Sequence, residues 1–182
     1  AYLADPASVD PSVAGAVLAL AATRGDKALF DAYRTRFETA KIPAERGRFL
    51  AALGNFREPA LMEVAIKYSL EGPLRPQEIF QLTGGLGDTE PGRDRLYRFV
   101  TENYATITSK LPPEFAGFLP FVASGCEPSR LEAARTFFAE PAHAAQGTVR
   151  TMAQVADQVN DCVRLRDREG AAVRSFLTDA SR

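Results

Sequence analysis

The sequence contains no tryptophan, one histidine and two cysteines, and these low counts exclude several kinds of site. The zinc-binding signature HExxH needs two histidines one helical turn apart, so it cannot occur in a chain whose one histidine is His143. A Ser–His–Asp or Cys–His arrangement would have to use the same residue, yet no GxSxG elbow is present. We expect His143 to be an exposed residue in a loop between helices. The sequence therefore indicates no self-sufficient catalytic site.

The two cysteines, Cys126 and Cys162, lie far apart in the sequence and neither belongs to a CxxC pair. With a single histidine to help them, they do not form a plausible metal cluster, and two cysteines are too few for a framework of disulfides. Small, buried or half-buried free thiols are the interpretation that we favour for both.

The chain also lacks an excess of charge of either sign and a long apolar run. Lysine and arginine total 22 and aspartate and glutamate 23, which gives a net charge of −1 and argues against a nucleic-acid surface. No apolar run approaches the ~20 residues of a membrane helix, so we predict no membrane segment. The start lacks the basic and apolar regions of a signal peptide, and Ala1 in place of Met suggests an excised fragment.

Helical periodicity recurs from end to end, whereas strand-like alternation does not. Proline and glycine punctuate the pattern at short intervals, in positions where they begin and end helices. The expected helices are Pro11–Thr23, one capped by Asp26, one from Pro43 to Gly54, one around Leu61–Tyr68, one from Pro76 to the glycines at 84–87, one from Pro91 through Ile107, one from Pro112 through Val122, one from Pro128 through Phe138, Thr148–Arg166, and a short terminal helix around Val173–Leu177.

About ten helices joined by short links predict an all-α fold in which neighbours run nearly antiparallel. Each apolar stripe is narrow and suits pairing with adjacent helices, so we expect helical hairpins stacked as a HEAT- or armadillo-like superhelix. No strict repeat period is visible, and no segment resembles a linker, so residues 1–182 are predicted to form a single helical-repeat domain. The helix Pro11–Thr23 has apolar residues on more than one side, and we expect it to be incompletely covered.

Two patterns resemble functional motifs without matching them. Gly84-Gly85-Leu86-Gly87 has neither the spacing nor the preceding strand of a phosphate-binding loop, so we interpret it as a helix end and turn. Asp157 and Asp161 lie one helical turn apart, close in sequence to Arg164 and Arg166, and we interpret them as a solvated polar face and not as a metal or acid/base pair.

An ordered set of short strings, spaced along nearly the whole chain, carries more information than any single motif. These strings are Ala4–Pro11, Ala21–Asp26, Leu29–Asp31, Leu50–Gly54, Pro59–Leu61, Arg75–Glu78, Gly92–Arg93, Phe99–Tyr104, Arg130–Glu132 and Phe137–Phe138. Together they resemble the C-terminal helical domain of bacterial zinc aminopeptidases of the aminopeptidase N family, which are related to the endoplasmic-reticulum aminopeptidases.

The resemblance implies that this chain is the non-catalytic C-terminal portion of a larger zinc aminopeptidase. It assigns the zinc, its HExxH ligands and the anchor for a peptide's amino group to a catalytic domain upstream in the same polypeptide. It also implies that the helical domain walls the cavity over the active site and helps to select peptide substrates by access and length. The alternative is a free-standing helical-repeat scaffold that binds another protein, and the upstream coding sequence would distinguish the two.

Arg75 and Gln77 are the residues that we expect to face the substrate cavity. They lie just before and within the first turn of the short helix that starts at Pro76, where free amide groups and the positive end of the helix dipole favour a carboxylate such as a peptide C-terminus. Arg75 could add a bidentate contact. In the alternative interpretation, Arg75 pairs with Glu78 or Glu71 and only stabilises the turn.

Overall fold

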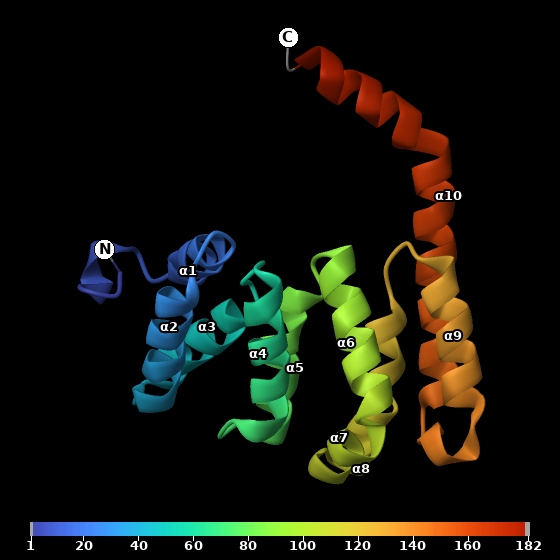
Figure 1. Ribbon diagram of the computed structural model, residues 1–182, viewed down its shortest axis with the longest axis horizontal. Coiled ribbons are helices and arrows are strands. Elements are labelled where there is room, and N and C mark those ends of the chain that lie inside the picture. Colours follow the sequence, from blue (N-terminus) through green and yellow to red (C-terminus); the bar gives the residue numbers. More distant parts are fainter. Residues whose placement is uncertain (1, 181–182) are drawn as a thin grey trace. The chain divides into compact units, whose positions relative to one another are not determined.

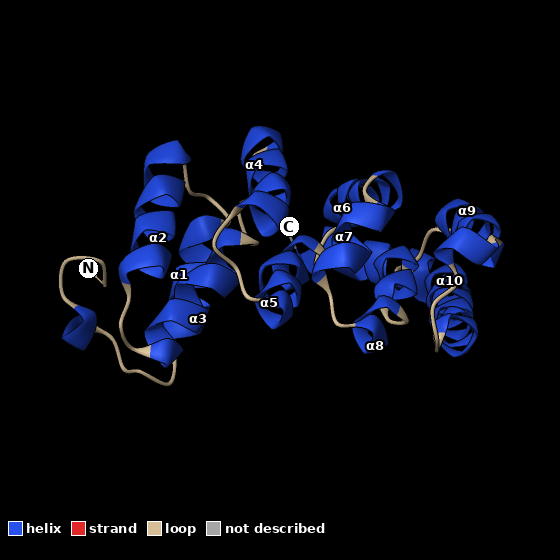
Figure 2. Cartoon of the chain, turned by 90° about the horizontal axis from the view of Figure 1, so that it is seen from below, coloured by secondary structure: helices blue, strands red, loops and turns tan. Residues whose placement is uncertain are grey.

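The structure, a computed structural model, describes residues 2–180, and only the backbone of Gln77 is described. Within this range the chain is helical and has no strand, which confirms the predicted all-α fold (Figures 1 and 2). The α-helices are α1 (Ala14–Ala22), α2 (Lys27–Thr39), α3 (Pro43–Leu53), α4 (Pro59–Glu71), α5 (Pro76–Leu86), α6 (Glu90–Glu102), α7 (Tyr104–Lys110), α8 (Pro113–Ala116), α9 (Pro128–Ala139) and α10 (Thr148–Ala180). Short 3-10 helices are η1 (Pro6–Ser8), η2 (Leu119–Ala123) and η3 (Pro141–His143).

The helices form two compact units, residues 1–99 and residues 100–182, and the division falls inside α6. The stacking of helical hairpins into one superhelix, and the single domain over 1–182, stay predictions.

The first unit is built around α3, which packs against α1, α2 and α5, while α4 packs against α5. Its core contains an aromatic cluster in which Tyr33 lies edge-on to both Phe49 and Phe56, with ring centroids 5.4 and 5.8 Å apart. Phe30 contacts Phe56 at 5.1 Å in the same geometry. These four side chains are buried, so the cluster fixes α2 against α3.

Helix starts follow the expected signals. The carboxylate of Asp26 accepts a hydrogen bond of 2.9 Å from the backbone N–H of Leu29 and caps α2. Proline occupies the first helical position of α3, α4 and α5, where its missing N–H would have had no partner in the helix. These starts confirm the predictions from Asp26, Pro43 and Pro76.

The glycines near the end of α5 differ in role from the prediction. The helix continues through Gly84 and Gly85 and ends at Leu86, with Gly87 as its C-cap. A side chain at Gly85 would collide with the backbone of Gly54 and with Asn55, whereas one at Gly84 would meet nothing within 4 Å. Gly85 therefore allows the end of α5 to approach the end of α3 closely, and Gly87 makes the turn.

Three predicted helices differ from the structure in extent. The helix expected from Pro112 through Val122 is divided into α8 and the 3-10 helix η2, with Gly117 and Phe118 between them. The helix expected from Pro91 through Ile107 is divided at Asn103, which leaves helical geometry (φ −118°, ψ 20°) between α6 and α7. The helix expected to end at Arg166 instead continues to Ala180 as α10. A single interior glycine, Gly170, costs a helix about 1 kcal/mol relative to alanine, which is too little to end it.

In the second unit, α10 packs against α9 and η2, and η2 also packs against α9. Val155 and Val159 of α10 and Leu131, Ala134 and Phe138 of α9 are buried, so the two helices form a paired hairpin (Figure 1). The C-terminal half of α10 is exposed, with Phe176 70% exposed.

The apolar residues of α1 and of its N-cap, Val13, are covered unevenly. Leu18 is buried in the core of the first unit, whereas Val13, Val17 and Leu20 are 49%, 40% and 71% exposed. These fractions agree with the expectation that this helix is incompletely covered.

Candidate functional site

Arg75 lies immediately before α5 and is its N-cap residue. Pro76 follows it directly, and its backbone is extended (φ −74°, ψ 154°), as is typical of a residue before proline. The backbone N–H of Arg75 donates a hydrogen bond of 2.8 Å to Oε2 of Glu78. This contact is the second half of a capping box and fixes the first turn of α5.

The carboxylate of Glu78 also forms an ion pair with Arg46 of α3. Nε and Nη2 of Arg46 lie 3.1 and 3.2 Å from the two carboxylate oxygens, and the two side chains are only 19% and 12% exposed. Burial by itself would raise the pKa of Glu78, but the hydrogen bonds from Arg46 and from the backbone of Arg75 outweigh it and lower the pKa. Glu78 is therefore held as a carboxylate.

Arg46 makes three further contacts that fix this pair. Its guanidinium donates to the carbonyl oxygens of Phe37 and Pro73, at 3.0 and 3.2 Å, and lies 3.8 Å above the ring of Phe37. The segment that precedes Arg75 is thus tied to α2 and α3 by one arginine.

The guanidinium of Arg75 itself is exposed. Glu78 is paired with Arg46, and Glu71 lies 3.6 Å from Lys67. Among the described residues, neither carboxylate forms the ion pair with Arg75 that the alternative interpretation expected. The turn is stabilised by the backbone of Arg75 and leaves its side chain accessible. The side chain of Gln77, the other predicted cavity residue, lies outside the described part of the chain.

His143 is not the exposed loop residue that we expected. It lies in η3, its side chain is 23% exposed, and its ring stacks on Phe137 with centroids 3.8 Å apart at 8°. Nδ1 lies 3.0 Å from the carbonyl oxygen of Phe137, and the hydroxyl of Tyr104 donates to the carbonyl oxygen of His143 at 2.8 Å. His143 therefore packs in an aromatic cluster that closes the α9–α10 hairpin.

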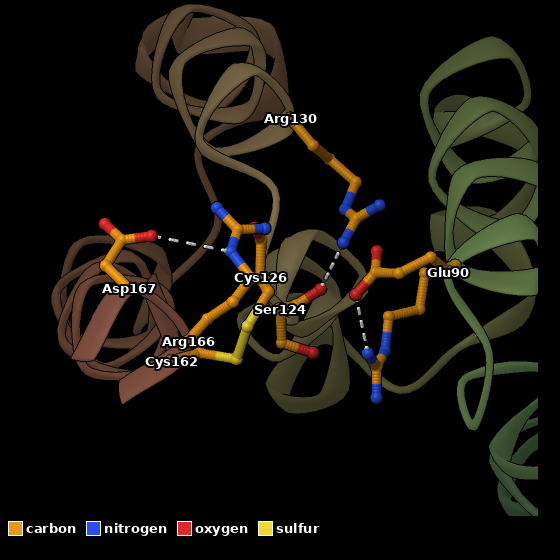
Figure 3. The surroundings of a disulfide bond; sticks show 8 residues. Glu90, Ser124, Cys126, Arg130, Cys162, Arg166 and Asp167 are labelled. Atoms are coloured by element: carbon orange, nitrogen blue, oxygen red, sulfur yellow. Dashed lines mark hydrogen bonds and ion pairs between the residues drawn. A yellow bond between two sulfur atoms is a disulfide. The ribbon is translucent and has the colours of Figure 1, made fainter. Parts of the chain in front are cut away.

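Cys126 and Cys162 form a disulfide bond, so the expectation of two free thiols is wrong (Figure 3). Cys126 precedes α9, Cys162 lies within α10, and their Cα atoms are 5.3 Å apart. Nη1 of Arg166, one turn after Cys162, donates a hydrogen bond of 3.0 Å to the carbonyl oxygen of Cys126. The loop before α9 is thus attached to α10 by one covalent bond and one hydrogen bond.

Hairpin geometry explains why sequence spacing did not reveal this pair. The chain runs out along α9, reverses at η3 and returns along α10, which brings positions 36 residues apart level with one another. Comparing how far Cys126 and Cys162 lie from the turn between the two predicted helices would have indicated the pair.

The acidic pair of α10 faces solvent. Asp157 and Asp161 are exposed on α10, and Asp161 lies 3.8 Å from Arg164 with both side chains more than three-quarters exposed, as expected for a solvated face. Between residues 2 and 180 no group of three His, Cys, Asp or Glu side chains could hold a metal ion. The same range contains no helix long and apolar enough to span a bilayer.

Comparison with known proteins shows the family of this chain. The family described as the ERAP1-like C-terminal domain matches residues 1–161. The chain belongs to this family. It is also similar to mitochondrial Aminopeptidase 2 of Saccharomyces cerevisiae, with 24% identity over 134 residues, which cover 71% of this chain and 14% of the yeast protein. The chain therefore spans only a small part of that relative, and the last part of α10 lies beyond the family match.

Proposed function

We propose that this ERAP1-like C-terminal domain is the non-catalytic helical part of a zinc aminopeptidase, and that it walls the cavity over the active site and limits which peptides enter. The family match over 1–161 is the observation that carries the proposal. The similarity to a yeast aminopeptidase supports it, since that protein is named for the activity.

The proposal gives the zinc site to a catalytic domain upstream in the same polypeptide. The described residues supply no set of metal ligands, and the chain has one histidine, so zinc does not fit here and no chemical step is assigned to this chain. A coding sequence with HExxH upstream of residue 1 supports this division, and an open reading frame that begins at the domain contradicts it.

Arg75 is the cavity residue that the geometry supports best. A wall that selects peptides by length needs a cation that the C-terminal carboxylate of a longer peptide can reach. The side chain of Arg75 is exposed, and its backbone is fixed by the hydrogen bond to Glu78, which is itself paired with Arg46. Gln77, in the first turn of α5, is proposed to contribute a polar contact beside it.

The test is the Arg75→Ala change in the complete enzyme, with Arg24→Ala as the control because Arg24 is also an exposed arginine of the first unit. If Arg75 binds the C-terminus of longer peptides, its loss raises KM for these peptides about tenfold or more and leaves single aminoacyl substrates unchanged. Equal kinetics for both substrate classes would overturn the role of Arg75 in binding.

A further inference from the structure

A pocket of about 380 Å³ lies within the second unit. Two segments line it: residues 114–118, which comprise the end of α8 and the start of the turn into η2, and residues 146–154, which comprise the first turns of α10 and the two residues before it. Its size is that of a small-molecule site, at the lower end of the usual range of about 300–1,000 Å³.

The backbone fixes the position of the two segments. A side chain at Gly117 would overlap the carbonyl oxygen of Gln146, so glycine is needed for the segments to touch. Gly147 adopts φ +94°, a conformation that favours glycine, and turns the chain into α10. The hydroxyl of Thr148 then accepts a hydrogen bond of 3.0 Å from the backbone N–H of Ala145. The walls of the pocket are therefore set by packing and do not depend on long side chains.

The lining carries one charge of each sign. Glu114 contributes a carboxylate and Arg150 a guanidinium, and neither forms an ion pair with the other or with any other side chain in the described part of the chain. On α9, by contrast, the exposed Arg135 is paired with Glu132 at 2.7 Å. A pocket with two opposite charges that do not pair with each other can accept a ligand that carries both a positive and a negative charge.

The remaining lining residues are suited to the same kind of ligand. Thr151 is 3% exposed, and among residues 2–180 its hydroxyl has no hydrogen-bond partner, although it lines the pocket. Gln146 and Gln154 add amide donors and acceptors, and Phe118, 51% exposed, offers an apolar face. A hydroxyl that lines a pocket can donate a hydrogen bond to a ligand carboxylate or accept one from a ligand ammonium group.

We propose that this pocket binds a small zwitterion, of the size of a free amino acid or a dipeptide with an apolar side chain. The carboxylate would lie at Arg150, where the positive end of the α10 dipole adds to the attraction, and the ammonium group at Glu114. The apolar side chain would contact Phe118. Phosphates and dicarboxylates are disfavoured because Glu114 repels a second negative charge. Only residues of the second unit are involved, so the inference does not rest on the proposed cavity.

The test is a titration of the 182-residue chain with L-leucine at pH 7, followed by the NMR shifts of the Gly117 and Gly147 amides and by calorimetry. N-acetyl-L-leucine lacks the ammonium group and L-leucinamide lacks the carboxylate. We expect saturable binding of leucine. Each blocked compound should bind at least about tenfold more weakly, because each loses one charge-assisted contact. Equal binding of all three compounds, or no saturable shift with leucine, would overturn the proposal without any variant.

Variants then show which residue binds the ammonium group of the ligand and which binds its carboxylate. Glu114→Gln should weaken the binding of leucine and of leucinamide and leave the affinity for N-acetyl-leucine unchanged. Arg150→Gln should weaken the binding of leucine and of N-acetyl-leucine and leave the affinity for leucinamide unchanged. Glu132→Gln and Arg174→Gln are matched controls, because both residues are exposed helical positions outside the pocket and should leave all three affinities unchanged. Variants that bind leucine as tightly as the wild-type chain would contradict the assignment.

Discussion

Glu78 binds the guanidinium of Arg46, 32 residues earlier, and at the same time accepts a hydrogen bond from the backbone N–H of Arg75. One carboxylate therefore joins α3 to α5 and begins α5. The arrangement separates a residue that stabilises the fold, Arg46, from one that leaves its side chain exposed, Arg75.

Replacement of Arg46 by alanine should lower the free energy of unfolding by about 2–3 kcal/mol, because it leaves Glu78 half-buried without its cation. Arg75→Ala keeps the backbone hydrogen bond to Glu78 and should change the same quantity by less than about 0.5 kcal/mol. Urea unfolding of the two variants and the wild-type chain gives the comparison. A larger loss for Arg75→Ala than for Arg46→Ala would show that the roles are reversed.

The pH dependence of stability should carry the signature of Glu78. Its pKa is lower in the folded chain than the ordinary value of 4.5, so its contribution to stability is present above pH 4.5 and is lost as the pH falls through the folded pKa. We expect the stability difference between wild type and Glu78→Gln to be largest near neutral pH and to shrink steadily below pH 4.5. A difference that stays constant from pH 7 to pH 3 would rule out this ionisation as its source.

The two adjacent glycines of α5 should respond oppositely to alanine. Gly85→Ala places a methyl group against the backbone of Gly54 and should destabilise the chain by about 1–3 kcal/mol. Gly84→Ala meets open space on the exposed side of the helix and should stabilise it by about 0.5–1 kcal/mol. Thermal melting of the two variants measures the effect. Equal shifts of the same sign would contradict the close approach of α3 and α5.

Loss of the Cys126–Cys162 disulfide should destabilise the second unit by about 4 kcal/mol, the chain-entropy value for a sequence separation of 36 residues. Reduction and the double serine variant should lower the melting temperature to the same extent. The control is a thiol count on the unfolded, unreduced chain, where we expect no reactive thiol. Two reactive thiols under those conditions would disprove the bond.

Much of the first unit could be predicted because its signals are local. Asp26 caps its helix through its own side chain, and Pro43 and Pro76 begin theirs because each removes an N–H that the first turn cannot use. The start of a helix depends on a few adjacent residues, so one sequence suffices to locate it.

The features that sequence reasoning missed depend on contacts between distant residues. The break at Asn103 has no proline or glycine to mark it, and α10 continues past Arg166 although few of its later side chains are buried. The disulfide and the pocket beside Gly117 exist only because α9, η2 and the start of α10 pack together. Local propensity carries no information on which turn of one helix lies beside which turn of another.

The proposed role of this domain as a cavity wall is tested most directly by the hydrolysis of a peptide series. The complete enzyme is compared with a version that ends before residue 1 of this domain. The series runs from an aminoacyl chromophore through peptides of increasing length to a folded protein with a free amino terminus. We predict that both versions cleave the chromophore, and that only the complete enzyme discriminates by length and spares the folded protein. Identical length profiles for the two versions, or loss of chromophore hydrolysis without the domain, would contradict the account.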